Sequence, residues 1–300
     1  MINDIPSNEF HFAGHDTFHL RYTWLPKAAD YINKNPNGVS FSAYDKVMIE
    51  LGIGKNMASA LRHWSESSQL FEKNHATMNH QFTNLGSEIF QLDPFLERVE
   101  SNWLLHYLIS SNHKKNGLWF YLFNVFNEPI IIKDEFLFSA TNWFQERGVE
   151  INKTTFERDF QCCMNMYDSS KMNSSKSSES ITLSPLRELK LLRKIGDNYH
   201  LRSMTNKEIS PAAFSFCLLD YLENEGYQTS TPFSDLLNGV KSPGRIFRMT
   251  ESLLIDYLKE LNKYNQGFDF DNTAGMQQLI KRSDKKLNKL LVLKKVYAQQ

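Results

Sequence analysis

Apolar residues recur every three to four positions through most of the chain, which is the spacing of amphipathic helices. In the first part this pattern predicts helices over residues 25–33, 43–51, 56–69, 93–109, 118–126, 133–147 and 153–167. After a polar gap it predicts helices over residues 186–195, 211–225, 233–237 and 250–261. Polar and aromatic alternation predicts a small hairpin over 71–82 and a short strand over 199–202. Residues 268–293 are expected to close the chain as a turn, a helix and a further strand. The expected fold class is mainly α with small β-hairpins.

A Ser-rich stretch, Asp168–Ser180, interrupts this pattern with the sequence DSSKMNSSKSSES. Such a composition cannot bury enough apolar surface to order itself, so we expect a linker or an exposed loop. This stretch separates an N-terminal part from a C-terminal part that begins near Ile181, so we expect a multi-domain chain. We expect an N-terminal helix-turn-helix domain of winged-helix type at 1–110 and a helical middle region at 111–180. A C-terminal helical domain at 181–300 is a second candidate for a winged-helix module.

Charge and cysteine usage narrow the function classes. Lysine plus arginine equals aspartate plus glutamate at 34 each, which excludes a wholly basic DNA coat but leaves room for local basic patches. The three cysteines form no CxxC pair, which fits a thiol-reducing compartment. No signal sequence and no apolar run long enough to span a membrane is present, so we expect a cytoplasmic protein without a membrane partner.

The strongest local motif is a helix-turn-helix at about residues 43–67. Val47 and Leu51 lie four residues apart on one face of the first helix. Gly52 and Gly54 follow, and glycine permits the positive φ that a tight turn requires. Two helices joined by such a turn form the motif whose second helix enters the major groove of DNA.

Five residues of the second helix are candidates for DNA contact: Lys55, Asn56, Ser59, Arg62 and His63. Arg62 can bind a guanine edge or a phosphate, and Asn56 can bind adenine or cap its helix. Lys55 lies at a helix N-terminus, which attracts phosphate. A buried helical hairpin with a solvated polar face would give the same pattern, and this alternative stays open.

The segment FHFAGHDTFHLRYTWLPKA contains the candidate catalytic pair His15 and Asp16. A His-Asp pair suits acid-base or metal-assisted phosphodiester chemistry. Zinc binding by histidines four residues apart is a weaker alternative, because the neighbouring Phe and Gly residues disfavour a helix there. In a third interpretation Asp16 caps the following helix and His15 bonds to the backbone.

Further basic residues are candidate phosphate contacts, namely Arg21, Lys27 and Arg245. Arg21 and Lys27 are equally compatible with ordinary surface charge. Arg245 belongs to the turn SPGR, for which a role as a turn inside the domain is favoured. The basic stretch Lys281–Lys295 can follow a DNA backbone or form a solvated helix. The acidic and basic run at 157–159 is interpreted as a solvated helix face. No Walker loop, GxGxxG after a strand or GxSxG is present, so we expect no nucleotide cofactor.

Four segments together resemble a known family: FAGHDTFHLRYTWLPK, LGIGKNMASALRHW, SPGRIFRMTESLL and DNTAGMQQL. The family is a bacterial one of unknown function, whose members lie beside genes for phosphorothioate modification of DNA. The resemblance implies a DNA-binding partner of a sulfur-modification machine in antiviral defence. It also implies a DNA-nicking endonuclease that uses a divalent metal such as Mg²⁺ or Mn²⁺.

Two other functions remain as alternatives at this point. The first is a non-catalytic recognition subunit or transcriptional regulator, which needs the helix-turn-helix but no cleavage site. The second is a protein-interaction scaffold, because helical hairpins also serve as docking surfaces. No compact pairing of carboxylates with lysine, typical of many nucleases, is evident in the sequence, and the oligomeric state and DNA target stay open.

Overall fold

A computed structural model describes residues 5–6, 9–171, 183–226, 228–263, 267–273, 276–282 and 288–298. Contacts divide the described chain into two compact units. The larger unit comprises the described residues of Asn3–Leu122 and Asn127–Leu201, and the smaller comprises those of Phe123–Phe126 and Arg202–Gln300. The three-domain division expected from the sequence stays a prediction. No described helix has the length and apolar character to cross a membrane.

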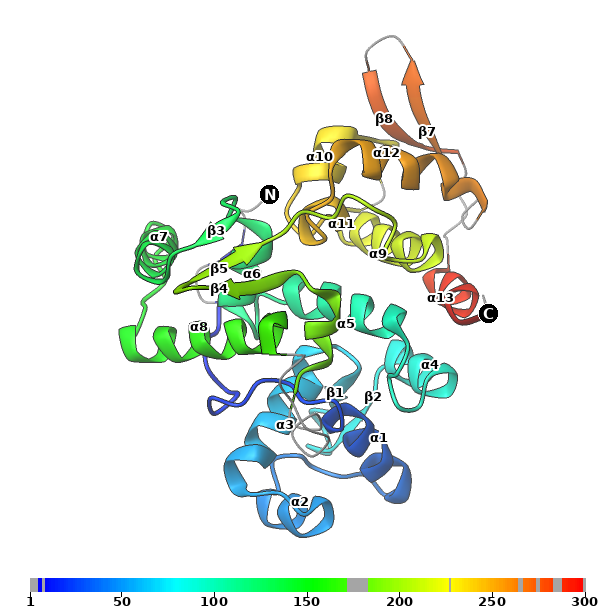
Figure 1. The fold of residues 1–300 in the computed structure, drawn as a ribbon. Helices are drawn as coiled ribbons and strands as arrows, with labels where there is room; N and C mark the ends of the chain where they lie inside the picture. The colour runs from blue at the N-terminus through cyan, green and yellow to red at the C-terminus, as the bar shows by residue number, and fades with distance from the viewer. Residues whose placement is uncertain are drawn as a thin grey trace. The chain divides into compact units, whose positions relative to one another are not determined.

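The first 167 residues contain eight described helices, shown in Figure 1: α1 (Trp24–Lys34), α2 (Tyr44–Leu51), α3 (Lys55–Ser67), α4 (Asn84–Leu92), α5 (Val99–Ser111), α6 (Gly117–Asn124), α7 (Lys133–Gln145) and α8 (Lys153–Tyr167). Two small antiparallel sheets accompany them. The first pairs β1 (Phe71–Lys73) with β2 (His80–Phe82). The second has the order β3-β5-β4, formed by Ile130–Ile131, Asn198–Leu201 and Leu192–Ile195. The expectation of a mainly helical fold with small hairpins is confirmed.

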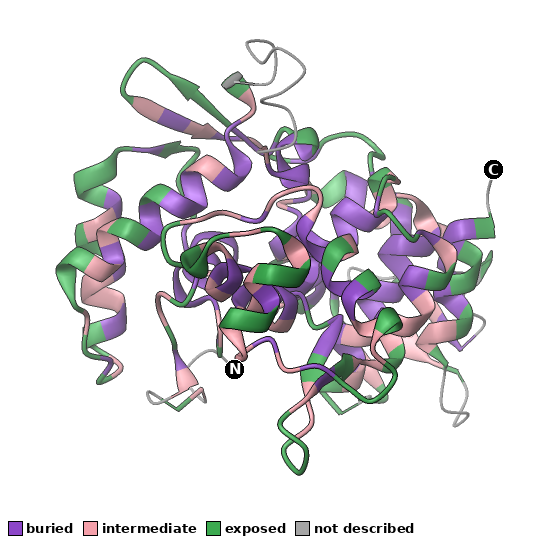
Figure 2. Ribbon diagram, turned by 90° about the horizontal axis from the view of Figure 1, so that it is seen from below, coloured by how far each residue is buried: buried purple, intermediate pink, exposed green. Residues whose placement is uncertain are grey.

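Helix α5 lies in the core of the larger unit. All of its residues from 101 to 110 are buried, because apolar side chains occur on every side of the helix. Trp103, Tyr107, Trp119 and Phe120 are among the largest fully buried side chains. Helices α2 and α3 are instead buried over part of their surface only, α2 at Val47 and α3 along the side that includes Leu61 and Trp64. Figure 2 colours the ribbon by burial. One face of α3 therefore remains available to solvent.

The smaller unit has its own helices and a three-stranded sheet. Its elements are α9 (Pro211–Asn224), β6 (Ser230–Pro232), α10 (Phe233–Asn238), α11 (Pro243–Ile246), α12 (Glu251–Glu260), β7 (Phe268–Thr273), β8 (Met276–Lys281) and α13 (Lys289–Ala298). The strand order is β6-β8-β7. Helix α9 begins where the Ser210 hydroxyl accepts a bond from Ala213 N–H, with Pro211 in the first turn.

Three predicted elements are wrong. The helix predicted over 93–109 begins only at Val99, because the Asp93 carboxylate accepts bonds from the backbone N–H groups of Glu97 and Arg98 and so stabilises a loop. The region 186–195 is a short 3₁₀ turn, Pro185–Leu189, followed by β4. The region 268–293 begins with a β-hairpin rather than with a turn and a helix. In the last two cases strand pairing overrides local preference.

The first residues of the predicted Ser-rich linker, Asp168–Lys171, belong to the folded part of the chain. Asp168 is buried, and its carboxylate accepts bonds from the backbone N–H groups of Ser170 and Lys194. Residues 172–180 of the predicted linker lie outside the described residues. The same holds for residues 283–287 of the basic stretch. Within the described part of that stretch, Lys289 forms ion pairs with Asp220 and Glu223.

Candidate functional site

The turn between α2 and α3 is tight, as its glycines predicted. Gly52 adopts the left-handed conformation with φ 62°, and its N–H bonds to the carbonyl of Met48. Ile53 N–H also bonds to that carbonyl, at 3.3 Å. Gly54 is extended and immediately precedes the first residue of α3, Lys55. A residue with a Cβ would be strained at position 52, so the glycine there is required by the backbone.

The outward side of α3 carries four of the five predicted DNA-contact residues. Lys55 and Asn56 are exposed, and Ser59 and Arg62 are half-buried. The Arg62 guanidinium lies 5.6 Å from the centre of the Tyr44 ring and donates to the Ser42 hydroxyl at 3.3 Å. The Asn56 side chain does not cap the helix. These side chains form one polar face with a positively charged group near each end.

The inner side of α3 is buried. Trp64 is fully buried, and its indole N–H donates to the carbonyl of Phe18 at 2.8 Å. His63, predicted among the DNA contacts, is only 6% exposed. Its ring centre lies 4.7 Å from that of Trp64 and 5.6 Å from that of His15. His63 therefore packs inside the protein, because it lies with Trp64 on the buried side of α3.

The buried position of His63 makes the stability of the protein depend on pH. Desolvation is the largest of the causes that lower its pKa from the ordinary 6.5 to about 3, and the charge of Lys115 acts in the same direction. Between these two pH values the unfolded chain binds a proton that the folded chain does not. The free energy of unfolding should therefore fall as the pH decreases from 6.5 towards 3.

This pH dependence can be measured from urea unfolding midpoints across that range. The variant His63→Asn should show a flatter dependence than the parent, because the buried titrating group is gone. The variant His75→Asn replaces an exposed histidine in the β1–β2 turn and should keep the parental dependence. Identical curves for the parent and His63→Asn would contradict the prediction.

A second contact network ties α3 to the β1–β2 hairpin. The His80 Nδ1 atom accepts a bond from Phe41 N–H, so Nε2 carries the proton and donates to a Glu66 oxygen at 3.0 Å. Lys115 donates to the other Glu66 oxygen. Burial raises the pKa of Glu66, but the bonds from His80 and Lys115 outweigh this effect and lower the pKa to about 2. The carboxylate stays ionised and fixes the C-terminal part of α3.

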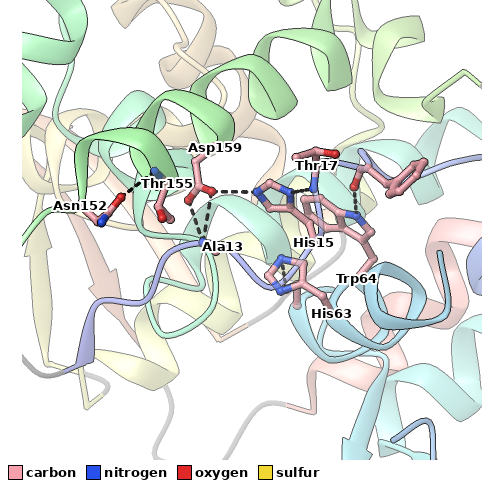
Figure 3. A network of polar contacts seen from close by, with 10 residues as sticks. Ala13, His15, Thr17, His63, Trp64, Asn152, Thr155 and Asp159 are labelled. Carbon is pink, nitrogen blue, oxygen red and sulfur yellow. Dashed lines mark hydrogen bonds and ion pairs between the residues drawn. The ribbon is translucent and has the colours of Figure 1, made fainter. Parts of the chain in front are cut away.

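The segment that contains GHDTF forms a strained turn against α8 (Figure 3). The buried Asp159 carboxylate accepts bonds from Ala13 N–H at 3.1 and 3.0 Å and from His15 Nε2 at 2.9 Å. On the other side of the ring, His15 Nδ1 accepts a bond from Thr17 N–H at 3.2 Å. Because Nδ1 is an acceptor, the ring is the neutral tautomer with its proton on Nε2.

The predicted catalytic pair is not formed as a pair in this structure. His15 is 2% exposed and bonds to Asp159, whereas Asp16 is exposed with φ 44°. Asp16 does not cap a helix either, since α1 begins at Trp24 and its N-cap is Thr23. The sequence interpretation placed Asp159 on a solvated helix face, and this is wrong. Its position three residues after the buried Phe156 is the signal that places it on the inner face.

The other predicted phosphate contacts lie in different surroundings. The Arg21 guanidinium lies 5.4 Å from the Phe18 ring centre and 5.2 Å from that of Trp24, and burial lowers its pKa. Lys27 is exposed on α1. Arg245 instead donates to the carbonyls of Asn124 at 3.0 Å and Phe126 at 3.2 Å, inside the smaller unit. Arg245 therefore bonds to the backbone of residues 124–126 rather than projecting into solvent.

A sequence profile of the family described as "Protein of unknown function (DUF4007)" matches residues 12–297. The chain belongs to this family. The match includes the strained turn, α3 and the Arg245 segment. No protein of curated function matches the sequence significantly.

Two crystal structures share the fold. The structure of magnesium ion-bound SspB superimposes with a TM-score of 0.84 at 24% identity, covering 98% of this chain and 91% of that chain. A second SspB crystal structure gives a TM-score of 0.83 at 23% identity, covering 97% of this chain and 90% of that chain. The family fold described here is thus the fold of SspB.

Proposed function

We propose that this protein binds double-stranded DNA through the outward face of α3. The observation that carries the proposal is the polar face formed by Lys55, Asn56, Ser59 and Arg62 on a helix whose opposite side is buried. A helix N-terminus attracts phosphate, and Lys55 adds a positive charge there. Arg62 is aligned by Tyr44 and Ser42, which reduces the entropy lost when the guanidinium binds a base or phosphate.

The order of the surrounding elements supports a winged-helix module. Helix α1 is followed by an antiparallel bridge between Val39 and His80, by α2 and α3, and then by the β1–β2 hairpin. The smaller unit has the corresponding order α9, β6, α10, α11, α12 and the β7–β8 hairpin. We assign both as winged-helix modules, in which the helix before the hairpin lies where DNA would bind.

Charge distinguishes the two modules. Helix α12 begins with exposed Glu251 and also exposes Asp256, whereas α3 begins with exposed Lys55 and Asn56. Carboxylates at a helix N-terminus repel phosphate, so DNA binding is assigned to α3 and not to α12.

Arg21 and Lys27 remain proposed phosphate contacts. His63 and Arg245 are left out, because their side chains are used inside the protein.

The proposed setting is the phosphorothioate modification of DNA in antiviral defence. The sequence resemblance to a family encoded beside these modification genes supports it, as does the fold shared with SspB. The partners would then be DNA and other proteins of the sulfur-modification machine, in the cytoplasm. In this setting α3 selects the DNA site at which sulfur is inserted.

Strand nicking is a second candidate function, favoured by the magnesium ion bound to SspB in its crystal structure. The residues described here do not supply an evident metal site, since they contain no group of three or more His, Cys, Asp or Glu side chains placed to hold an ion. The polar outward face of α3 favours a recognition subunit. Nicking with Asp16 as a catalytic group stays a prediction.

One experiment separates these candidates. A labelled duplex should bind the protein with an affinity that falls steeply as salt rises, because bound phosphates release counterions. Supercoiled plasmid incubated with Mg²⁺ or Mn²⁺ should then remain closed if the protein is a recognition subunit. Conversion to open circles that is lost in Asp16→Ala would establish nicking instead. Absence of salt-sensitive binding would contradict the proposed function and favour a protein-interaction scaffold.

A further inference from the structure

The turn at residues 13–17 contains an unusual concentration of left-handed backbone. Ala13, Gly14, Asp16 and Thr17 have φ values of 64°, 93°, 44° and 67°. Only one of these four is glycine, and a β-branched residue such as threonine rarely adopts positive φ. Such strain persists only where surrounding contacts compensate for it. The contacts that compensate for the strain therefore indicate the role of the turn.

On one side the turn is bound by a single carboxylate. Asp159 is 1% exposed and accepts bonds from both Ala13 N–H and His15 Nε2, as Figure 3 shows. The His15 ring, held by Asp159 at Nε2, in turn accepts a bond from Thr17 N–H at Nδ1 and so restricts the backbone of Thr17. One side chain of α8 thus constrains both ends of the turn.

On its other side the turn packs against α3. A Cβ on Gly14 would lie 2.7 Å from His63 Nδ1, so the His63 side chain on this helix leaves no room for a larger residue at position 14. The His15 ring stacks on Trp64 with 15° between the planes and 6.0 Å between the centres. Trp64 in turn donates to the Phe18 carbonyl just beyond the turn. The contacts run from Asp159 through the turn to α3.

We infer that Asp159 is a positioning residue for the DNA-binding helix α3 and acts through His15 and the strained turn. This inference rests on the proposed function of α3. Lys55 lies nine residues before Trp64, roughly 14 Å along the helix axis at 1.5 Å per residue. A change of tilt at Trp64 therefore displaces the DNA-contacting end of α3 more than the end where the turn packs.

The test compares two buried aspartates that both accept backbone N–H bonds. Asp159→Asn places an amide N–H or a weaker acceptor against Ala13 and His15. Asp93→Asn makes the same chemical change at a loop between α4 and α5, where Asp93 accepts from Glu97 and Arg98. Duplex DNA affinity is measured for the parent and both variants by fluorescence anisotropy. The NMR signal of the Trp64 indole N–H reports the packing of α3 without DNA.

We expect Asp159→Asn to shift the Trp64 signal and to weaken DNA binding about tenfold, while Asp93→Asn changes the affinity by less than about twofold. Equal losses in both variants would mean a general loss of stability and would overturn the inference. A shifted Trp64 signal with parental DNA affinity would also overturn it. If the parent itself fails to bind DNA, the proposed function fails, and the indole signal alone then decides whether Asp159 positions α3.

Should Asp159→Asn not fold, His15→Gln provides the second variant. Its amide nitrogen can take the place of the imidazole Nε2 and donate to Asp159, but the side chain has no acceptor atom at the position of Nδ1 for Thr17 N–H. We expect a shifted Trp64 signal and a smaller loss of DNA affinity in this variant. Hydrogen exchange on the unmodified protein adds an independent readout. The Ala13 and Thr17 amides should exchange more slowly when DNA is bound, and unchanged exchange would count against the coupling.

Discussion

Replacing Lys55 and Arg62 together by alanine should weaken binding to duplex DNA roughly 100-fold, if each lost contact is worth about 1.4 kcal/mol. Both side chains lie on the outward face of α3, and neither is buried. The dependence of the logarithm of affinity on the logarithm of salt concentration should also become shallower, by about 2 if both residues neutralise phosphates. Fluorescence anisotropy over a salt series measures both effects.

The matched control removes the same amount of positive charge elsewhere in the larger unit. Lys133 on α7 and Arg193 on β4 are both exposed, and their double alanine variant should keep the affinity within about twofold. An equal loss in both double variants would show that net charge, rather than the face of α3, determines binding. Unchanged affinity in Lys55→Ala/Arg62→Ala would remove the basis of the proposed function.

The largest expected effect on stability belongs to Trp64. Trp64→Ala should lower the free energy of unfolding by about 3–5 kcal/mol, because it leaves a cavity and an unpaired Phe18 carbonyl. The ring lies against His15, His63 and Trp119, so the cavity would form where α3 meets the strained turn. Urea unfolding followed by circular dichroism measures the change.

Two further variants separate the contributions of Trp64. Trp64→Phe retains much of the ring but removes the indole donor, and we expect a loss of about 1–3 kcal/mol. Ile49→Ala truncates a side chain that is 81% exposed on α2 and should change stability by less than about 0.5 kcal/mol. A Trp64→Ala variant as stable as the parent would contradict the packing described for α3.

The apolar spacing along the chain was sufficient to predict the helices around the candidate site. Val47 and Leu51 on one helix, Gly52 at the turn and Leu61 on the next helix are local signals, because helix periodicity and positive φ depend on neighbouring residues only. The exposed positions of Lys55 and Asn56 were predicted for the same reason. The hairpin after α3 was also predicted from alternation over a few residues.

The burial of chemically active side chains depended on contacts between distant segments. His63 and Asp159 each lie on a helix that the sequence predicted, but both side chains were predicted to be exposed to solvent and both are buried. His15 and Asp159 are 144 residues apart in the chain, and no local pattern records that they bond. Likewise, β4 pairs with β5 and replaces a predicted helix because strand pairing, which a single segment does not encode, determines its structure.

The sequence by itself thus determined the helical fold class, the tight turn before α3 and the polar face that begins at Lys55. Tertiary structure alone decided that His15 bonds to Asp159 instead of pairing with Asp16, and that Arg245 bonds to backbone carbonyls. The physical reason is that helix formation and turns depend on neighbouring residues, whereas desolvation and the choice of hydrogen-bond partner depend on which remote segments pack together.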